Sequence, residues 1–240
     1  MTQPPDPLAN AAAAAAVPQG GTVAPAVRGR ALRRFLANRM AIVGTLIVVA
    51  LVVLALFAPQ IAPHHPNDDI FRGMRGAGPS WEHPMGFDHL SRDLLSRVIF
   101  GTRIALLVGL ISTVISVVIG VIVGAAAGYF GGWVDEVLSL LTDTLMAFPL
   151  IALLVVLAAM LGPSLVTTIV VIGLTVWARY ARVVRAEVMS LRERDFVTAA
   201  RALGAFDGRI IWRHVVPNVL TSVIVLASLQ IGAIIILESA

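Results

Sequence analysis

The sequence predicts an all-α protein, a polytopic bundle of transmembrane helices in which five spans are visible. Hydrophobic residues make up 58% of the 240 residues and charged residues 13%, whereas a soluble domain has about 45–50% apolar and about 25% charged residues. Several apolar runs reach roughly 20 residues, the length that a helix needs to cross a bilayer core of ~30 Å. Arginines gather beside these runs, which is typical of the cytoplasmic ends of membrane spans.

The composition also excludes several kinds of chemistry. The chain has no cysteine and no lysine, so that all 18 basic residues are arginine. A thiolate metal site, a disulfide, a phosphate-loop lysine and a Schiff-base lysine are therefore excluded. The net charge of +4 comes without a basic stripe carrying interleaved aromatic residues, so we expect no nucleic-acid binding. No catalytic triad or metalloprotease motif is found, and we expect a non-catalytic chain without a metal site.

The amino-terminal part is predicted to be a tail followed by one span. Residues 1–30 are rich in Ala, Pro and Gln and predict a disordered cytoplasmic tail. Residues 31–58 form a basic flank and the first span, Met40–Ala58. Five arginines precede this span and none directly follows it, which places the amino terminus in the cytoplasm. Prolines follow the run where a cleaved signal peptide would have small residues, so we interpret it as an uncleaved span.

Residues 59–103 are predicted to form an extracytoplasmic loop that ends in an interfacial helix. The loop is rich in Pro, Gly, His and Asp, and Ser91–Phe100 alternates charged and apolar residues at helical spacing. The spacing of its histidines fits no metal-ligand motif, and we interpret them as solvated; they are His64, His65, His83 and His89.

Residues 104–240 are predicted to form the transmembrane core. The second span covers about Ile104–Tyr129 and turns at Gly131–Gly132 into a third span, Trp133–Leu161. Glycines at every fourth position predict a face on which two helices approach closely; they are Gly120, Gly124, Gly128 and Gly132.

The remaining spans flank a charged segment. Gly162–Pro163 leads to a fourth span, Ser164–Trp177, and the fifth span runs from Pro217 to Leu237. Between them, residues 187–216 are charged and helical in pattern, with arginines that predict a cytoplasmic position. Alternation of the spans places this segment and the amino terminus on the same side.

Asp143 is the one acidic residue well inside a predicted span, ~12 Å along the third helix from its charged start. Ionisable groups inside a membrane usually face water or a bundle interior. We therefore expect Asp143 either to line the inner part of a pathway or to pair with Arg179 or Arg182, and the sequence leaves both alternatives open.

The segment Asp195–Asn218 is the most informative one. Its pattern predicts a short helix with a small apolar face, which Gly204 ends. A second short helix with bulky apolar residues follows, and Pro217 opens the last span. A helical hairpin with small residues at its turn predicts an element that docks on a partner protein.

This segment resembles the EAA loop of bacterial ABC importer permeases, with matches at Ala199, Ala200, Gly204 and Pro217; Thr198 stands where the family usually has Glu. Further segments resemble the C-type permeases of the oligopeptide/dipeptide/nickel family; they are Met85–Arg97, Gly101–Arg103, Asp143 with Ala147–Pro149, and Arg213–Asn218.

The resemblance implies the fold of a type I importer permease and a function in peptide import across a bacterial inner membrane. It implies that a coupling helix contacts ATPase subunits through Thr198, Ala199, Ala200, Leu203, Gly204, Ala205, Phe206, Asp207 and Pro217. Two ATPase subunits would bind ATP and Mg²⁺, while this chain holds no cofactor. A sister permease in a heterodimer, an extracytoplasmic binding protein and lipid are the other implied partners.

The family continues beyond Glu238 to a sixth span, so we expect that this sequence is truncated before its last span. Import of nickel or of another small solute is an alternative within the same architecture. An ion-coupled secondary transporter is the alternative from another class, although ionisable residues at mid-membrane depth are nearly absent and the sequence shows no paired broken helices.

Overall fold

A computed structural model describes residues 33, 35–162 and 164–238, so the predicted tail and Pro163 lie outside the described part. Helices dominate the described residues, which form two isolated β-bridges but no strand. Among the described residues, four helices are long and apolar enough to cross a membrane, and a bent helix pair makes a fifth candidate. The prediction of an all-α polytopic bundle is therefore confirmed.

The chain divides into two units, residues 1–50 and 51–240. Helix α3, Arg39–Leu56, crosses this division and corresponds to the predicted first span. Nearly all of its side chains are exposed, and its 18-residue window has only 6% of residues buried. Exposed apolar side chains on all sides are expected for a membrane span that lipid surrounds. The short helix α4, Ala58–Ile61, follows it.

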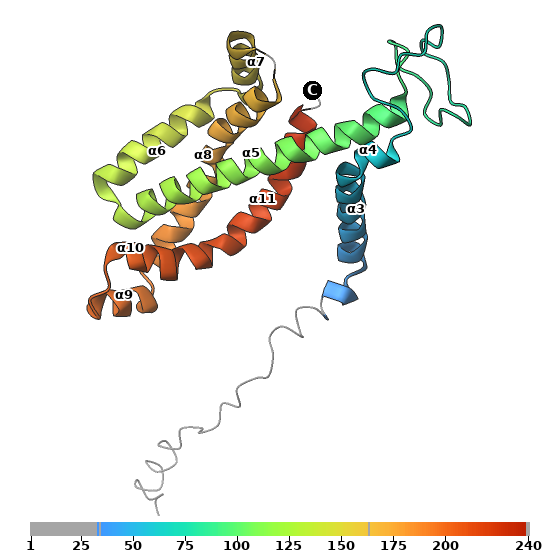
Figure 1. The fold of residues 1–240 in the computed structure, drawn as a ribbon. Helices are drawn as coiled ribbons and strands as arrows, with labels where there is room; N and C mark the ends of the chain where they lie inside the picture. Colours follow the sequence, from blue (N-terminus) through green and yellow to red (C-terminus); the bar gives the residue numbers. More distant parts are fainter. Residues whose placement is uncertain (1–32, 34, 163, 239–240) are drawn as a thin grey trace, which may run out of the picture. The chain divides into compact units, whose positions relative to one another are not determined.

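Helix α5, Leu94–Phe130, is the longest element, with 37 residues (Figure 1). The Asp93 side chain caps its start by accepting the Ser96 N–H at 2.8 Å, and Gly131 ends it with a φ of +66°. The helix expected over Ser91–Phe100 forms the first part of α5, from Leu94 on. Gly101 remains helical, so nothing separates that segment from the span.

Helix α8, Leu165–Leu191, packs closely along α5. A Cβ atom added at Gly120, Gly124 or Gly128 would lie within 2.7 Å of an α8 atom, so the two backbones nearly touch. Gly132, the fourth glycine of the predicted face, lies outside this contact. It follows the left-handed turn at Gly131 and begins another helix, where an added Cβ would meet nothing within 4 Å.

The predicted third span is two helices, α6 (Gly132–Ala147) and α7 (Leu150–Leu161), which meet at an angle of 81°. The predicted span Trp133–Leu161 is therefore bent, and the bent pair remains one candidate span. The cause is Pro149, because the residue before a proline is driven away from helical angles. Phe148 accordingly has a ψ of 133°.

The carboxyl-terminal part contains two short helices and a long one. Helix α9, Asp195–Ala202, and helix α10, Asp207–Ile210, form a hairpin. A π-helical turn, η1 (Ile211–Val215), then continues directly into α11, Val216–Glu238.

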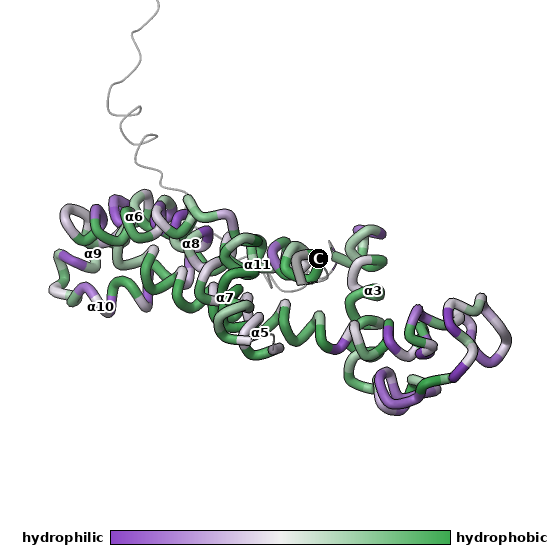
Figure 2. The backbone as a smooth tube through the Cα atoms, turned by 90° about the horizontal axis from the view of Figure 1, so that it is seen from above, coloured by the Kyte–Doolittle hydropathy of each residue, from purple (hydrophilic) through white to green (hydrophobic). Residues whose placement is uncertain are grey.

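The fifth span thus begins before Pro217, contrary to the expectation that the proline opens it. The Val216 N–H donates to the Ile211 carbonyl five residues back, and this wider turn accommodates a proline that has no N–H to donate. Figure 2 shows apolar residues along α5, α7 and α11, with hydrophilic residues gathered in α9, in α10 and in the loop before α5.

The loop before α5 has a small core of its own. His83 is 8% exposed, and its Nδ1 lies 2.9 Å from the Asp93 carboxylate. Its ring packs on Phe87, with ring centroids 4.3 Å apart, and stacks on His64. The interpretation of the loop histidines as solvated is therefore wrong for His83, whose ring is part of the packing that holds the loop on the start of α5.

Candidate functional site

The turn between α9 and α10 has the geometry of a helix that ends on glycine. Gly204 has a φ of +79°. Its N–H donates to the Arg201 carbonyl at 3.0 Å, and the Ala205 N–H donates to the Ala200 carbonyl at 3.1 Å. This pair of bonds is a Schellman motif, in which a left-handed residue closes the helix. We call residues 195–210 the docking hairpin.

One side of the docking hairpin is anchored in the bundle core. Val197 on α9 and Ile210 on α10 are fully buried, and Ala200 and Ala205 pack against the same core. That core also contains Tyr129 at the end of α5 and apolar residues of α8 and α11. The hairpin is therefore fixed on the ends of three long helices.

The exposed side of the docking hairpin carries two large apolar side chains. Leu203 is 88% exposed and Phe206 70%, and both flank the Gly204 turn. Thr198 and Ala199 lie exposed on α9, and the Thr198 hydroxyl donates to the Arg194 carbonyl at 3.4 Å. Large apolar side chains brought together on an anchored turn are typical of a surface that a protein partner covers.

Two further residues of the predicted coupling set, Asp207 and Pro217, lie at the starts of α10 and α11. Pro217 is the second residue of α11 and is exposed. Asp207 begins α10, and its carboxylate accepts a hydrogen bond at 2.6 Å from the Tyr129 hydroxyl of α5. Asp207 is therefore engaged within the chain.

The contact of Tyr129 with the hairpin was not predicted from the sequence. Tyr129 is 5% exposed, and its hydroxyl also accepts a hydrogen bond at 3.1 Å from Arg201 of α9. The Arg201 guanidinium lies over the Tyr129 ring, 5.7 Å from its centroid. This contact raises the pKa of Arg201, chiefly through the hydrogen bond to Tyr129. The only sequence signal was an aromatic residue at the end of a span beside a glycine turn.

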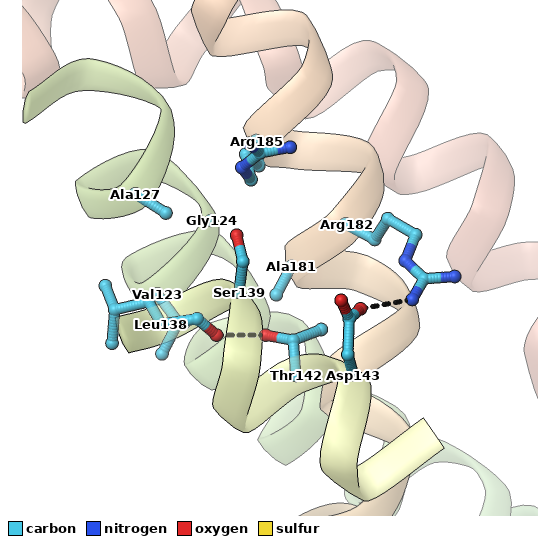
Figure 3. A pocket seen from close by; sticks show the side chains of 10 residues that line it. All are labelled: Val123, Gly124, Ala127, Leu138, Ser139, Thr142, Asp143, Ala181, Arg182 and Arg185. Carbon is cyan, nitrogen blue, oxygen red and sulfur yellow. Dashed lines mark hydrogen bonds and ion pairs between the residues drawn. The ribbon is translucent and has the colours of Figure 1, made fainter. Parts of the chain in front are cut away.

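A second candidate region is a cavity of about 310 Å³ between α5, α6 and α8. Figure 3 shows Asp143 of α6 and Arg182 of α8 meeting across it as an ion pair, with Thr142 beside them. Both charged side chains are more than half exposed. Of the two alternatives for Asp143, the pair with Arg182 is present, and the same carboxylate also lines the cavity.

Nearer the start of α6, Asp135 receives two hydrogen bonds from Arg185 of α8. Its side chain is 19% exposed, so this pair is far less accessible than the pair of Asp143 and Arg182. Within the described ranges, no group of three His, Cys, Asp or Glu side chains could hold a metal ion.

Comparisons with known proteins add two family matches. Residues 116–240 match the family described as binding-protein-dependent transport system inner membrane component. Residues 28–79 match the amino-terminal transmembrane domain of oligopeptide transport permease C.

Several curated proteins are similar over most of the chain. A dipeptide transport system permease protein of Alkalihalophilus pseudofirmus is 36% identical over 215 residues, which are 88% of this chain and 68% of that protein. A putative peptide permease protein of Brucella ovis is 38% identical over 210 residues, 88% of this chain and 69% of its own. A glutathione transport system permease protein of Escherichia coli is 36% identical over 204 residues, 85% and 67% of the two chains.

Proposed function

Because the chain belongs to the family of binding-protein-dependent transport system inner membrane components, we propose that it lines part of the translocation pathway of an ATP-driven importer for di- and oligopeptides. The family expected from the sequence motifs is thereby confirmed. The relatives are named for dipeptide, peptide and glutathione transport, which supports a peptide substrate.

The observation that carries this proposal is the docking hairpin. Its exposed face presents the large apolar side chains of Leu203 and Phe206, which a cleft of an ATPase subunit would cover. Its buried face, with Val197 and Ile210, is fixed in the core that joins α5, α8 and α11. A partner that moves the exposed face therefore acts on the long helices through apolar packing that does not yield easily.

We propose that the chain works within a complex of the kind that its family implies. Two ATPase subunits bind and hydrolyse ATP with Mg²⁺, a sister permease completes the pathway, and an extracytoplasmic binding protein delivers the peptide. This chain provides the surface on which an ATPase subunit docks and part of the wall of the translocation pathway, and it catalyses no reaction itself. The hairpin and the amino terminus then lie in the cytoplasm and the loop before α5 lies outside, with the chain in the inner membrane of a bacterium.

The ion pair of Asp143 and Arg182 supports a translocation pathway that runs beside the cavity between α5, α6 and α8. A charged side chain exposed to lipid at membrane depth is costly, so such groups face water or protein. Both charges are exposed on one face of the bundle. We propose that this face is a wall of the aqueous pathway.

The test is purification of the tagged chain with its complex from host membranes, followed by reconstitution. We expect ATPase subunits and a second permease to copurify, and labelled dipeptide to enter the vesicles only with ATP and the binding protein. Uptake that needs no ATP and collapses with the ion gradient would instead show an ion-coupled transporter. A complex that hydrolyses ATP but takes up no peptide would contradict the substrate.

A further inference from the structure

We propose that Tyr129 is a positioning residue, whose hydroxyl joins both arms of the docking hairpin to the end of α5 and thereby couples partner movement to the spans. The inference rests on the proposed function of the hairpin and adds a specific point through which the movement passes.

The geometry converges on one oxygen atom. The Tyr129 hydroxyl donates to Asp207 at 2.6 Å and accepts from Arg201 at 3.1 Å. Arg201 belongs to the first helix of the hairpin and Asp207 to the second. These partners are 72 and 78 residues away from Tyr129 in the sequence. A single phenol therefore ties the two arms to each other and to a helix that the chain does not connect to them directly.

The end of α5 is held in the same place from α8. Arg192, which follows α8 directly, donates to the Gly128 carbonyl at 3.2 Å. The close approach at Gly120, Gly124 and Gly128 joins the last turns of α5 to the second half of α8. Helices α5 and α8 thus form one rigid pair, and Tyr129 is the polar attachment of the hairpin to that pair.

This attachment determines what a force on Leu203 and Phe206 can do. Residues 192–194 form a short segment between α8 and α9, and a rotation of the hairpin about this segment would leave α5 behind. The buried apolar residues Val197 and Ile210 oppose such a rotation by close packing. The hydrogen bonds of Tyr129 add directional contacts to charged partners, which oppose the rotation further. The hairpin then moves together with α5 instead of pivoting on it.

The variant that tests this is Tyr129→Phe, which keeps the buried ring and removes only the hydroxyl. A matched control is Tyr180→Phe. Tyr180 is also fully buried against α5, but its hydroxyl has no hydrogen-bond partner in the described part of the chain. Both variants are prepared as complete complexes in vesicles, and three quantities are measured: recovery of ATPase subunits, ATP turnover, and peptide transported per ATP hydrolysed.

We expect Tyr129→Phe to retain recovery and turnover within twofold and to transport at least threefold less peptide per ATP, whereas Tyr180→Phe behaves as wild type. Transport per ATP at the wild-type level in Tyr129→Phe would overturn the proposal. A loss of ATPase recovery would also overturn it, because the hydroxyl would then serve folding or docking.

A second pair of variants tests the contact from the hairpin side. Asp207→Ala removes the acceptor of the Tyr129 hydroxyl, and Asp207→Asn retains one. We expect Asp207→Ala to reduce transport per ATP as much as Tyr129→Phe does. Asp207→Asn should keep most of the wild-type transport per ATP. The double variant Tyr129→Phe with Asp207→Ala should lose no more transport per ATP than either single variant. Additive losses would show that the two residues act separately. If wild-type complexes show no ATP-dependent uptake, the proposed function fails, and that result is distinct from any difference between variants.

Discussion

The carboxylate of Asp135, in the first turn of α6, receives two hydrogen bonds from the guanidinium of Arg185 on α8. The Ser139 hydroxyl donates to the same carboxylate at 3.1 Å. An acidic side chain in the first turn also suits the positive end of the helix dipole. Asp135 therefore fixes the start of α6 on α8, directly after the glycine turn that ends α5.

We predict that Asp135→Asn destabilises the helix pair, because it removes a paired charge and leaves the half-buried Arg185 without its partner. Loss of a hydrogen bond to a charged group costs about 1–3 kcal/mol. The measurement is the thermal midpoint of the purified complex. The control is Asp143→Asn, whose pair with Arg182 is exposed on both sides and contributes about 0–1 kcal/mol.

The same control tests the pathway wall. We expect Asp143→Asn to keep its thermal midpoint and still to reduce peptide uptake, because the carboxylate faces the aqueous cavity. Equal peptide uptake by Asp143→Asn and wild type would show that Asp143 is not part of the translocation pathway. An equal loss of stability in both variants would contradict the distinction between the two ion pairs.

The glycine contact of α5 and α8 leads to a prediction about a single methyl group. In Gly124→Ala the added Cβ would lie 2.5 Å from the Ala181 carbonyl oxygen, so the two backbones must separate. Such overpacking costs about 1–3 kcal/mol. The control is Gly101→Ala in the same helix, where an added Cβ meets nothing within 4 Å. We expect a reduced complex yield only for Gly124→Ala, and equal yields would show that the helices tolerate separation.

The sequence predicts the features that depend on local composition. The apolar runs give the spans, the spacing of Gly120, Gly124 and Gly128 gives a close helix contact, and Gly204 gives the end of α9. Each of these follows from sterics or from hydropathy of neighbouring residues. The bend at Pro149 belongs to the same class, and a stricter use of the proline rule would have found it.

The contacts between residues far apart in the sequence could not be predicted from local composition. Nothing local to Tyr129 indicates that its hydroxyl meets Asp207, 78 residues later. The burial of His83 depends on Asp93 and Phe87, which assemble only when the loop folds onto α5. The choice of Arg182 over Arg179 as the partner of Asp143 depends on the rotation of α8 against α6. Composition and spacing therefore predict helices well, whereas pairing between helices requires their relative positions.

The orientation of the chain can be measured because the sequence contains no cysteine. Single cysteines replace Trp81, which is fully exposed in the loop before α5, and Leu203, which is exposed on the docking hairpin. In intact spheroplasts we expect an impermeant maleimide to label Trp81→Cys and to label Leu203→Cys only after permeabilisation. The opposite pattern would reverse the topology.

The loop before α5 is predicted to keep its structure in mildly acidic medium, because of Asp88. Burial alone would raise the pKa of this carboxyl, but hydrogen bonds from the backbone of Arg92 and Leu90 and from the Arg97 and Arg92 side chains outweigh it and hold the pKa well below its usual range. A depressed pKa gives stability that is present above the unfolded value of 3.8 and is lost only as pH falls towards the folded value.

We therefore expect trypsin to cleave the loop of the wild-type complex equally slowly at pH 7.5 and pH 5.5, after correction for the activity of trypsin. Asp88→Asn removes the charge that the two arginines share and should be cleaved several times faster at both values. The control is Asp68→Asn, whose side chain is 80% exposed. Faster cleavage of the wild type at pH 5.5 would show that another group controls the loop.

The last prediction concerns Gly204, which ends α9 with a φ of +79°. An added Cβ would meet nothing within 4 Å, so a substitution there is opposed by backbone conformation and by nothing else. A β-branched residue in this conformation costs roughly 1–2 kcal/mol or more, whereas asparagine visits it more readily.

We expect Gly204→Val to open the turn, to displace Leu203 and Phe206 from their common surface, and to reduce ATPase recovery and uptake at least fivefold while the chain still inserts. Gly204→Asn, with a comparable increase in volume, should retain most of both activities. Equal losses in the two variants would show that side-chain size at the turn matters, as it would if a partner pressed directly on Gly204. Wild-type behaviour of both would mean that the geometry of this turn does not govern docking.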